Sequence, residues 1–214
     1  MALTLYYGSG SPYAWRVWLA LEHKQVPYEF KLLSFDKGDT RSPDFLAVNP
    51  RGKVPTIDHD GFRLWESVAI LEYLEERFPE RPLLPQGDAK ARATARRLMA
   101  ETDAYLGKAL GELMEQTLFH KGPVDAAALA EAQDAVVAEL ERFAAELKGD
   151  WFVGDRLSLA DLTIYPTVRL VRRVDDRQPA NGIGSRMPAR LAAFIARMEQ
   201  LPYAAKTMPP HWKG

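Results

Sequence analysis

The sequence predicts an α/β domain with a mixed sheet, followed by an all-helical domain. Within the first 80 residues, short apolar runs typical of strands alternate with apolar residues at helical spacing, whereas only helical spacing continues after residue 88. Prolines at positions 79, 82 and 85 separate the two parts, because a helix cannot continue through such a cluster. We therefore expect a first domain over residues 1–82, a linker over 83–88 and a helical domain over 89–214.

The α/β domain begins with a strand–helix–strand unit. The apolar run Leu3–Tyr7 predicts a strand, and residues 28–33 have the β-propensity of a second one. Between them, Ser11 suits a helix N-cap and Pro12 the first helical position, which predicts a helix that ends near Lys24. Such a unit has parallel strands joined by a right-handed crossover.

The rest of this domain predicts a hairpin and a further helix. Residues 54–57 and 62–65 have strand character and flank Asp60-Gly61, a dipeptide typical of hairpin turns. The polar residues 35–49 that precede them predict a loop with at most a short helix. An amphipathic helix follows the second hairpin strand, so the order of elements is βαβ(α)ββα.

The helical domain begins with two long helices. Apolar residues trace one stripe from Leu98 to Thr117, and Gly122-Pro123 ends this helix. A near-heptad apolar spacing from Leu129 to Leu147 predicts a second helix, antiparallel to the first.

A capping box opens the next helix. Ser158 and Asp161 form the Ser-x-x-Asp motif, and an apolar helix over 162–171 follows, with Pro166 expected to kink it. We expect a loop over 175–187, a last helix over 188–200, and irregular chain after that.

The composition excludes several kinds of site. The 214 residues include no cysteine, which excludes a disulfide, a thiolate zinc site, an iron–sulfur cluster and a CxxC pair. The four histidines form no metal-ligand pair at helical spacing, and we expect no metal. A net charge of −1 argues against nucleic acid or an anionic membrane as a partner. Without a signal peptide pattern or a long apolar run, a cytoplasmic location is expected.

Four motifs in a fixed order give the chain a family resemblance. They are Ser11-Pro12-Tyr13, Asn49-Pro50-Arg51-Gly52-Lys53-Val54-Pro55, Trp65-Glu66-Ser67, and Gly154-Asp155 followed by Ser158 and Asp161. With these motifs the chain resembles a cytosolic glutathione S-transferase over nearly its whole length. The stretch that begins at Ser11 is most similar to the serine-type branch, which includes bacterial, zeta-like and theta-like members. The resemblance implies a thioredoxin-like first domain, glutathione as co-substrate, and a homodimer formed mainly across the third and fourth helices.

The resemblance also implies glutathione-binding roles for five residues. In the family, the proline at Pro55 follows a cis bond, and the residue before it, here Val54, pairs its backbone with that of the glutathione cysteine. Ser67 would hold the γ-glutamyl carboxylate at a helix N-terminus, where free N–H groups favour an anion, although a serine there is also a simple helix N-cap. Glu66 would help to bind the γ-glutamyl amine. Lys53, which replaces a glutamine common in the family, would pair with the glycyl carboxylate.

Ser11 is the expected catalytic residue. Its hydroxyl would donate a hydrogen bond to the glutathione sulfur, beside a helix N-terminus that favours a thiolate. A free thiol has a pKa of about 8.5, and one charge-assisted hydrogen bond of about 1.5–3 kcal/mol lowers such a pKa by about one or two units. Two alternatives remain: Ser11 is only a helix N-cap, or Tyr6 or Tyr7 supplies the donor from the end of the first strand.

Three further residues are candidates for a substrate pocket: Tyr13, Tyr105 and Arg173. Tyr13 stands where zeta-like members carry a cysteine, which counts against maleylacetoacetate isomerase activity. Arg173 falls where zeta-like members hold an acidic substrate, although a cluster of arginines is also typical of a solvated helix face. Tyr105 could line an apolar pocket or pack in the core.

The function implied by the resemblance is that of a glutathione S-transferase used in detoxification. The glutathione thiolate would attack small hydrophobic electrophiles. One alternative is a glutathione-dependent isomerase of the maleylacetoacetate type, or a dehalogenase, in which the thiolate is regenerated. A second alternative is a non-catalytic protein of the same fold that binds glutathione or another ligand.

Overall fold

A four-stranded mixed sheet forms the centre of the first of two compact units in this computed structural model. The structure describes residues 2–123, 125–178 and 181–212. The strands β1 (Leu3–Gly8), β2 (Glu29–Leu33), β3 (Thr56–His59) and β4 (Phe62–Trp65) lie in the order β2-β1-β3-β4. β1 and β2 are parallel, whereas β1 with β3 and β3 with β4 are antiparallel. The predicted mixed sheet is therefore confirmed.

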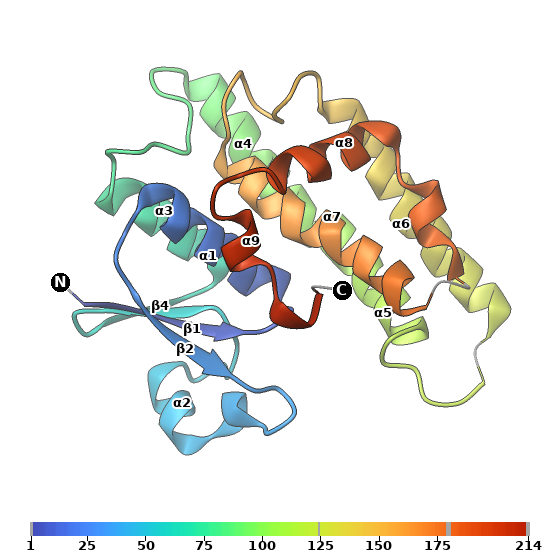
Figure 1. The fold of residues 1–214 in the computed structure, drawn as a ribbon, viewed down its shortest axis with the longest axis horizontal. Coiled ribbons are helices and arrows are strands. Elements are labelled where there is room, and N and C mark those ends of the chain that lie inside the picture. Colours follow the sequence, from blue (N-terminus) through green and yellow to red (C-terminus); the bar gives the residue numbers. More distant parts are fainter. Residues whose placement is uncertain (1, 124, 179–180, 213–214) are drawn as a thin grey trace. The chain divides into compact units, whose positions relative to one another are not determined.

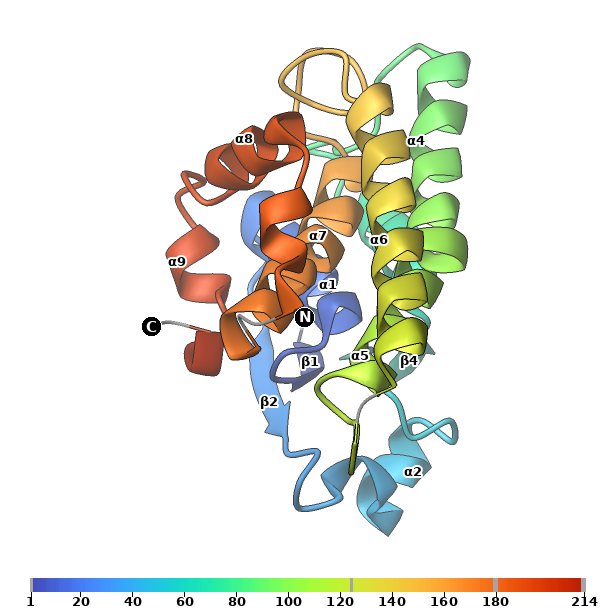
Figure 2. The ribbon, with the colours of Figure 1, turned by 90° about the vertical axis from the view of Figure 1, so that its right-hand side faces the viewer.

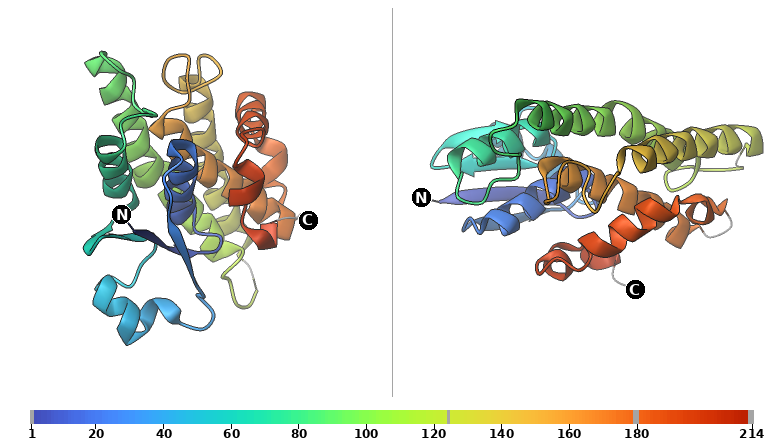
Figure 3. Two further views of the ribbon diagram at one scale, coloured as in Figure 1. Left: turned by 60° about the vertical axis from the view of Figure 1, so that its left-hand side comes forward. Right: turned by 90° about the horizontal axis from the view of Figure 1, so that it is seen from above.

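Helices lie on both faces of this sheet. α1 (Pro12–Lys24) and α3 (Ser67–Arg77) share one face, and α2 (Pro43–Val48) lies on the other, as Figures 1 and 3 show. α1 begins where the sequence predicted, with Ser11 as N-cap and a proline at its first position. β3 begins at Thr56 and not at residue 54 as expected, because the intervening Pro55 has no N–H to give to a strand partner.

A buried ion pair fixes the chain that leaves α3. Lys24 Nζ lies 2.7 Å from Glu75 Oε2, and their side chains are 0% and 6% exposed. Glu75 also accepts hydrogen bonds from the N–H groups of Leu83 and Leu84, while Lys24 donates to the Phe78 carbonyl. Charged groups are rarely buried without such partners. These bonds tie residues 83 and 84, which we expected in the linker, to the first unit.

The second unit, residues 85–200, consists of helices. The long helix predicted up to Thr117 is divided into α4 (Ala89–Glu101), a π-helical turn (Thr102–Leu106) and α5 (Gly107–Gln116). α6 (Ala126–Glu146) runs beside it, as Figure 2 shows. The Thr102 hydroxyl donates to the Leu98 carbonyl at 2.7 Å, a bond that competes with the regular backbone ladder where the π turn begins.

The most buried helix of this unit, α7 (Leu159–Arg177), is longer than predicted. It continues past residue 171 into the expected loop over 175–187, because Val174 extends the apolar face and is 0% exposed. Residues 179–180 of that expected loop lie outside the described residues. A 3-10 turn (Ile183–Arg186) and α8 (Ala189–Met198) complete the unit.

The segment after α8 packs with the first unit, which differs from the expected helical domain over 89–214. We call residues 201–212 the C-terminal strap; it contains α9 (Ala204–Thr207) and a 3-10 turn (Pro210–Trp212). α9 lies beside α1 in Figures 1 and 3. The side chains of Ala204 and Trp212 are buried, and the removal of their apolar surface from water stabilises the attachment of the strap.

Within the described part of the chain, we find no helix that is both long enough and apolar enough to cross a membrane. The same residues contain no group of three or more His, Cys, Asp or Glu side chains placed to hold a metal ion.

Candidate functional site

Three of the sequence motifs meet at one end of the sheet of the first unit. Tyr6 of β1 is opposite Thr56 of β3, so the end of β1 lies beside the start of β3. Thr56 is in turn opposite Trp65, the last residue of β4. The loop after β1, the segment before β3 and the first residues of α3 are therefore neighbours. These are the segments that carry Ser11, residues 53–55 and residues 66–67.

Gly8 brings the first two segments into contact. A Cβ atom at Gly8 would lie 3.0 Å from Val54 Cγ2 and still closer to the ring of Phe35. A side chain therefore has no space at this position. Because Gly8 has no side chain, the loop that leads to Ser11 can pass directly over Val54.

Ser11 holds the N-terminus of α1. Its Oγ accepts a hydrogen bond from Ala14 N at 3.2 Å, and its own N–H donates to the Gly8 carbonyl at 3.1 Å. Gly10, with φ +88°, provides the left-handed residue that this tight turn needs. The bond from Ala14 uses a lone pair of Ser11 Oγ and leaves the hydroxyl proton for another acceptor. Since Ser11 is half-buried, its hydroxyl can reach a ligand.

The two tyrosines considered as alternatives face opposite sides of β1. Tyr7 is 1% exposed and packs against Trp18 and Phe30, and burial raises the pKa of its phenol to about 12. Tyr6 lies on the face of α2, where its ring centroid is 5.5 Å from that of Phe45. Neither tyrosine occupies a helix N-terminus, whereas Ser11 does.

The side-chain amide of one buried residue, Asn49, holds the segment before β3. Asn49 is 0% exposed, and its Nδ2 donates to the Lys53 carbonyl at 2.8 Å and to Thr56 Oγ1 at 2.9 Å. Lys53 itself is exposed, and the bond between Val54 and Pro55 is cis. The loop is thus bonded to a buried side chain, while its lysine side chain is open to solvent.

Glu66 and Ser67 begin α3 in an unusual conformation. Glu66 is the N-cap and has φ 65°, a value that costs a residue with a side chain about 1–2 kcal/mol. Ser67 is the first helical residue rather than the cap, and it is 6% exposed. Strain of this kind persists where the surrounding structure enforces it, and it is common at ligand-binding positions. The first turn of α3 leaves free N–H groups of the kind that suit an anion.

Comparison with known proteins identifies the family. Residues 10–77 match the family model described as glutathione S-transferase, N-terminal domain, and residues 89–202 match the model of the C-terminal domain. The chain belongs to the glutathione S-transferase family. The predicted family and the predicted fold class, a thioredoxin-like domain followed by an all-helical one, are confirmed.

Relatives within the glutathione S-transferase family include more than one kind of enzyme. Glutathione S-transferase A of Pleuronectes platessa is 31% identical over 98% of this chain and 92% of its own length. A maleylacetoacetate isomerase of Dictyostelium discoideum is 33% identical over 88% of each. The crystal structure of a glutathione S-transferase from the Antarctic clam Laternula elliptica has a TM-score of 0.84 at 32% identity, over 99% of this chain and 94% of that one.

Asn49 is a residue of the candidate site that the sequence analysis did not predict. It stands at the start of the motif that ends in Val54-Pro55. An asparagine that precedes a proline usually indicates a turn, and nothing in the sequence shows that its amide is fully buried.

The three candidate pocket residues lie in different parts of the chain. Tyr13, in the first unit, is 39% exposed, and the Arg16 guanidinium lies 4.8 Å from the centre of its ring. Tyr105 and Arg173 belong to the second unit. Burial and the nearby Arg177 lower the pKa of Arg173. Tyr105 is 58% exposed, on the π-helical turn, and lines a groove that does not include Arg173.

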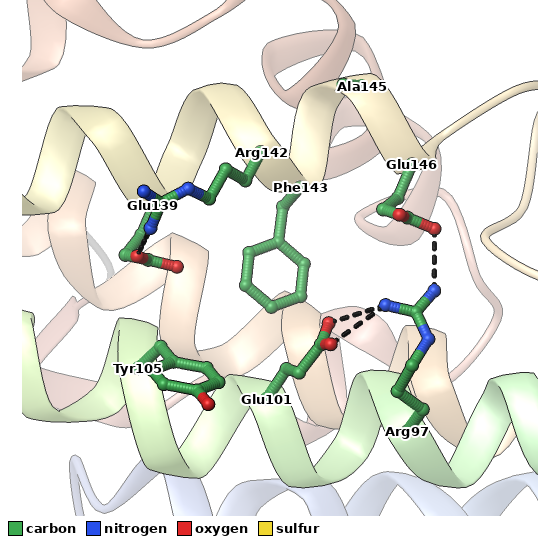
Figure 4. Close-up of a pocket in the computed structure, with 8 residues that line it drawn as sticks. All are labelled: Arg97, Glu101, Tyr105, Glu139, Arg142, Phe143, Ala145 and Glu146. Atoms are coloured by element: carbon green, nitrogen blue, oxygen red, sulfur yellow. Dashed lines mark hydrogen bonds and ion pairs between the residues drawn. The ribbon is translucent and has the colours of Figure 1, made fainter.

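This groove lies between α4 with its π-helical turn and α6, as Figure 4 shows. Its volume is about 360 Å³. Arg97 bridges its two walls, because it lies 2.8 Å from Glu101 on its own helix and 2.8 Å from Glu146 on α6. Arg142 and Glu139 form a second ion pair on α6, and the ring of Phe143 forms part of the floor. The groove therefore carries both signs of charge around aromatic surface.

Proposed function

We propose that the protein is a cytoplasmic glutathione transferase in which Ser11 stabilises the thiolate of glutathione. The convergence of three motifs at one end of the sheet supports this function most strongly. That arrangement brings together a hydroxyl at one helix N-terminus, open N–H groups at a second, and an exposed lysine between them. A tripeptide with two carboxylates and one thiol needs these groups.

Each end of glutathione has a partner of suitable charge in this proposal. Ser67 and the first N–H groups of α3 bind the γ-glutamyl carboxylate, and Glu66 binds the γ-glutamyl amine. The backbone of Val54 pairs with the cysteinyl residue, and Lys53 pairs with the glycyl carboxylate. Pro55 fixes the direction of the chain at Val54. Because these contacts hold both ends of the tripeptide, its thiol is directed toward the loop of Ser11.

The hydroxyl of Ser11 then lowers the pKa of the bound thiol. A hydrogen bond from a neutral donor to a thiolate is worth about 1.5–3 kcal/mol, which corresponds to about one or two pKa units. The N-terminus of α1 adds about 0.3–1 kcal/mol in the same direction. The thiolate attacks an electrophilic carbon, a carbon–sulfur bond forms, and the leaving group departs with its electron pair.

Titration calorimetry with glutathione tests the binding part of the proposal. The wild-type protein is expected to bind, and Ser67→Ala is expected to weaken binding by about 10- to 100-fold because a hydrogen bond to a charged group is lost. Ser185→Ala is the matched control, since Ser185 is an exposed serine of the second unit. Wild-type protein that binds no glutathione at millimolar concentration contradicts the proposal.

Turnover of glutathione with 1-chloro-2,4-dinitrobenzene tests the catalytic part. Ser11→Ala is expected to lower kcat/KM by about 10- to 100-fold, whereas Tyr6→Phe leaves it within about twofold. If Tyr6→Phe abolishes turnover and Ser11→Ala does not change it, the donor is the tyrosine. If binding is intact but no electrophile or peroxide reacts, the non-catalytic alternative is correct.

A glutathione-dependent isomerase is the second candidate function. The 33% identity to a maleylacetoacetate isomerase over most of the chain favours it. Isomerisation of a cis-dienoic acid without net consumption of glutathione distinguishes it from transfer, and release of halide ion distinguishes a dehalogenase.

We also propose a homodimer formed across the groove of the second unit. A groove that carries arginines and glutamates together suits a copy of itself, because a two-fold axis can bring an arginine of one copy to a glutamate of the other, and each such pair then occurs twice. Tyr105, Phe143 and the stem of Arg97 supply apolar surface of the kind enriched in interface cores.

Light scattering after gel filtration tests the dimer. Tyr105→Asp is expected to shift the protein toward a monomer because it places an unpaired charge in the interface. Phe119→Asp is the control, since Phe119 is equally exposed at 57% but does not line the groove. A monomeric wild-type protein, or a Tyr105→Asp variant that remains dimeric, contradicts this interface.

A further inference from the structure

The C-terminal strap contacts the loop that carries Ser11. His211 Nδ1 lies 3.0 Å from Ser9 Oγ, although the two residues are separated by 202 positions in sequence. The indole N–H of Trp212 donates to His211 Nε2 at 2.9 Å. The imidazole ring is thus held between the loop and the indole, and both of its nitrogens are occupied.

These two bonds determine which nitrogen of His211 carries the proton. An indole N–H can only donate, so His211 Nε2 must accept and cannot be protonated. In the neutral ring the proton is then on Nδ1, which donates to Ser9 Oγ. Trp212 therefore orients His211 as a donor toward Ser9, two residues before Ser11.

Packing reinforces this contact. Trp212 is 5% exposed, and its ring meets the buried ring of Trp15 edge-on with centroids 5.4 Å apart. A Cβ atom at Gly10 would lie 3.1 Å from His211 Nε2, so the imidazole lies directly against the loop backbone. On its other side the same loop begins at Gly8, which leaves no space for a side chain beside Phe35 and Val54. The loop is therefore enclosed from two directions.

The strap that carries His211 is itself anchored to α1. His23 Nδ1 lies 3.0 Å from the hydroxyl of Tyr203, and Lys206 Nζ lies 2.6 Å from Glu22 Oε1. α1 is the helix that Ser11 caps, so the same helix holds both the Ser11 hydroxyl and the base of the strap. The position of His211 relative to Ser11 is consequently well defined.

We propose that His211 is a positioning residue for Ser11, which acts through Ser9 and is oriented by Trp212. The inference rests on the proposed function of Ser11 and extends it to the C-terminal strap. His211 does not touch the reacting atoms in this role. It holds the turn over residues 8–11 in the conformation that directs the Ser11 hydroxyl toward the sulfur. Loop conformations in which this hydrogen bond cannot form are then less populated.

Ultraviolet absorbance of the thiolate in the glutathione complex, recorded against pH, tests this role without any electrophile. His211→Phe keeps a ring but removes both hydrogen bonds, and it is expected to raise the pKa of the bound thiol by about half a unit to one unit. His211→Asn keeps an amide donor near the position of Nδ1 and is expected to restore most of the wild-type value. Ser9→Ala removes the acceptor and is expected to give the same rise as His211→Phe, and the double variant no further rise.

His120→Phe is the matched control, because His120 bonds a carbonyl within its own loop of the second unit. It is expected to leave the thiol pKa unchanged. An unchanged pKa in both His211→Phe and Ser9→Ala, with a normal thiolate signal in the wild type, overturns the positioning role and leaves the proposed function intact. A wild-type complex without a thiolate signal near neutral pH overturns the proposed function, and the positioning role with it.

Discussion

The two serines that cap α1 and α7 show how the same residue type serves different purposes. Ser158, at the N-terminus of α7, is 2% exposed, and its hydroxyl donates to Asp161 Oδ2 at 2.6 Å. Ser11, at the N-terminus of α1, is half-buried, and its Oγ only accepts, from Ala14 N. The proton of Ser158 is already used inside the fold, whereas that of Ser11 is available to a ligand.

The difference originates in the third residue of each helix. Asp161 occupies that place in α7, and besides Ser158 it accepts from the N–H of Phe152 at 2.9 Å. In α1 the corresponding residue is Ala14, which offers no acceptor. In the capping box of α7, the serine cap donates its hydroxyl proton to the acidic third residue of the helix. Where that residue offers no acceptor, as in α1, the proton of the serine cap is available to a ligand.

The largest expected effect is the loss of stability when the capping box is removed. Asp161→Ala leaves buried donors of Phe152 and Ser158 without an acceptor, and is expected to lower the free energy of unfolding by about 3–5 kcal/mol. Denaturant unfolding measures this. Asp155→Ala is the control, since that carboxylate is 95% exposed, and a loss of less than about 1 kcal/mol in Asp161→Ala contradicts the structural role of the box.

The pH dependence of stability provides the next effect. Burial raises the pKa of Asp161 to about 6, although hydrogen bonds from Ser158 and Phe152 act in the opposite direction. An unfolded aspartate has a pKa of about 4, so between about pH 4 and 6 only the folded protein keeps this proton. The part of the contribution of Asp161 to stability that depends on this proton is therefore complete below about pH 4 and is lost as the pH rises through about 6.

This loss amounts to about 1.4 kcal/mol per pH unit, or up to about 3 kcal/mol in all. It is measured as the difference in unfolding free energy between wild type and Asp161→Asn at several pH values. A difference that is constant, or that grows in favour of the wild type as the pH rises, shows that Asp161 is ionised in the fold.

The smallest effect compares the two caps directly. Ser158→Ala is expected to cost about 1–2 kcal/mol of stability with no change in turnover, because its hydroxyl serves only the fold. Ser11→Ala is expected to cost no more than about 1 kcal/mol, because it loses a single cap bond. Thermal unfolding of the two variants gives the comparison, and equal losses of both stability and turnover would remove the distinction between the caps.

The sequence predicted most of the fold because local signals agreed with the final structure. The strand–helix–strand pattern, the hairpin at Asp60-Gly61 and the capping box each depend on residues close together in the chain. The prediction was less successful where packing between residues distant in sequence sets the end of a helix or the unit to which a segment belongs. α7 extends to Arg177 because Val174 is buried, and the strap joins the first unit through Trp212.

The motif residues of the candidate site could be predicted from the sequence, but the residues that hold them in place could not. Ser11, Val54 and Ser67 stand in short motifs that a reader of the sequence can find. Asn49 and His211 act through contacts that only the folded chain creates, with the Lys53 carbonyl in one case and with a loop 202 positions away in the other. No periodicity or spacing in the sequence encodes such contacts.

The pKa of the glutathione thiol in the bound complex tests the central claim most directly. We expect that pKa to lie at least one unit below that of free glutathione in the wild-type protein, and to return to the free value in Ser11→Ala, with Ser158→Ala like the wild type. A bound thiol whose pKa is the same in wild type and Ser11→Ala would contradict the assignment of Ser11 as the group that stabilises the thiolate.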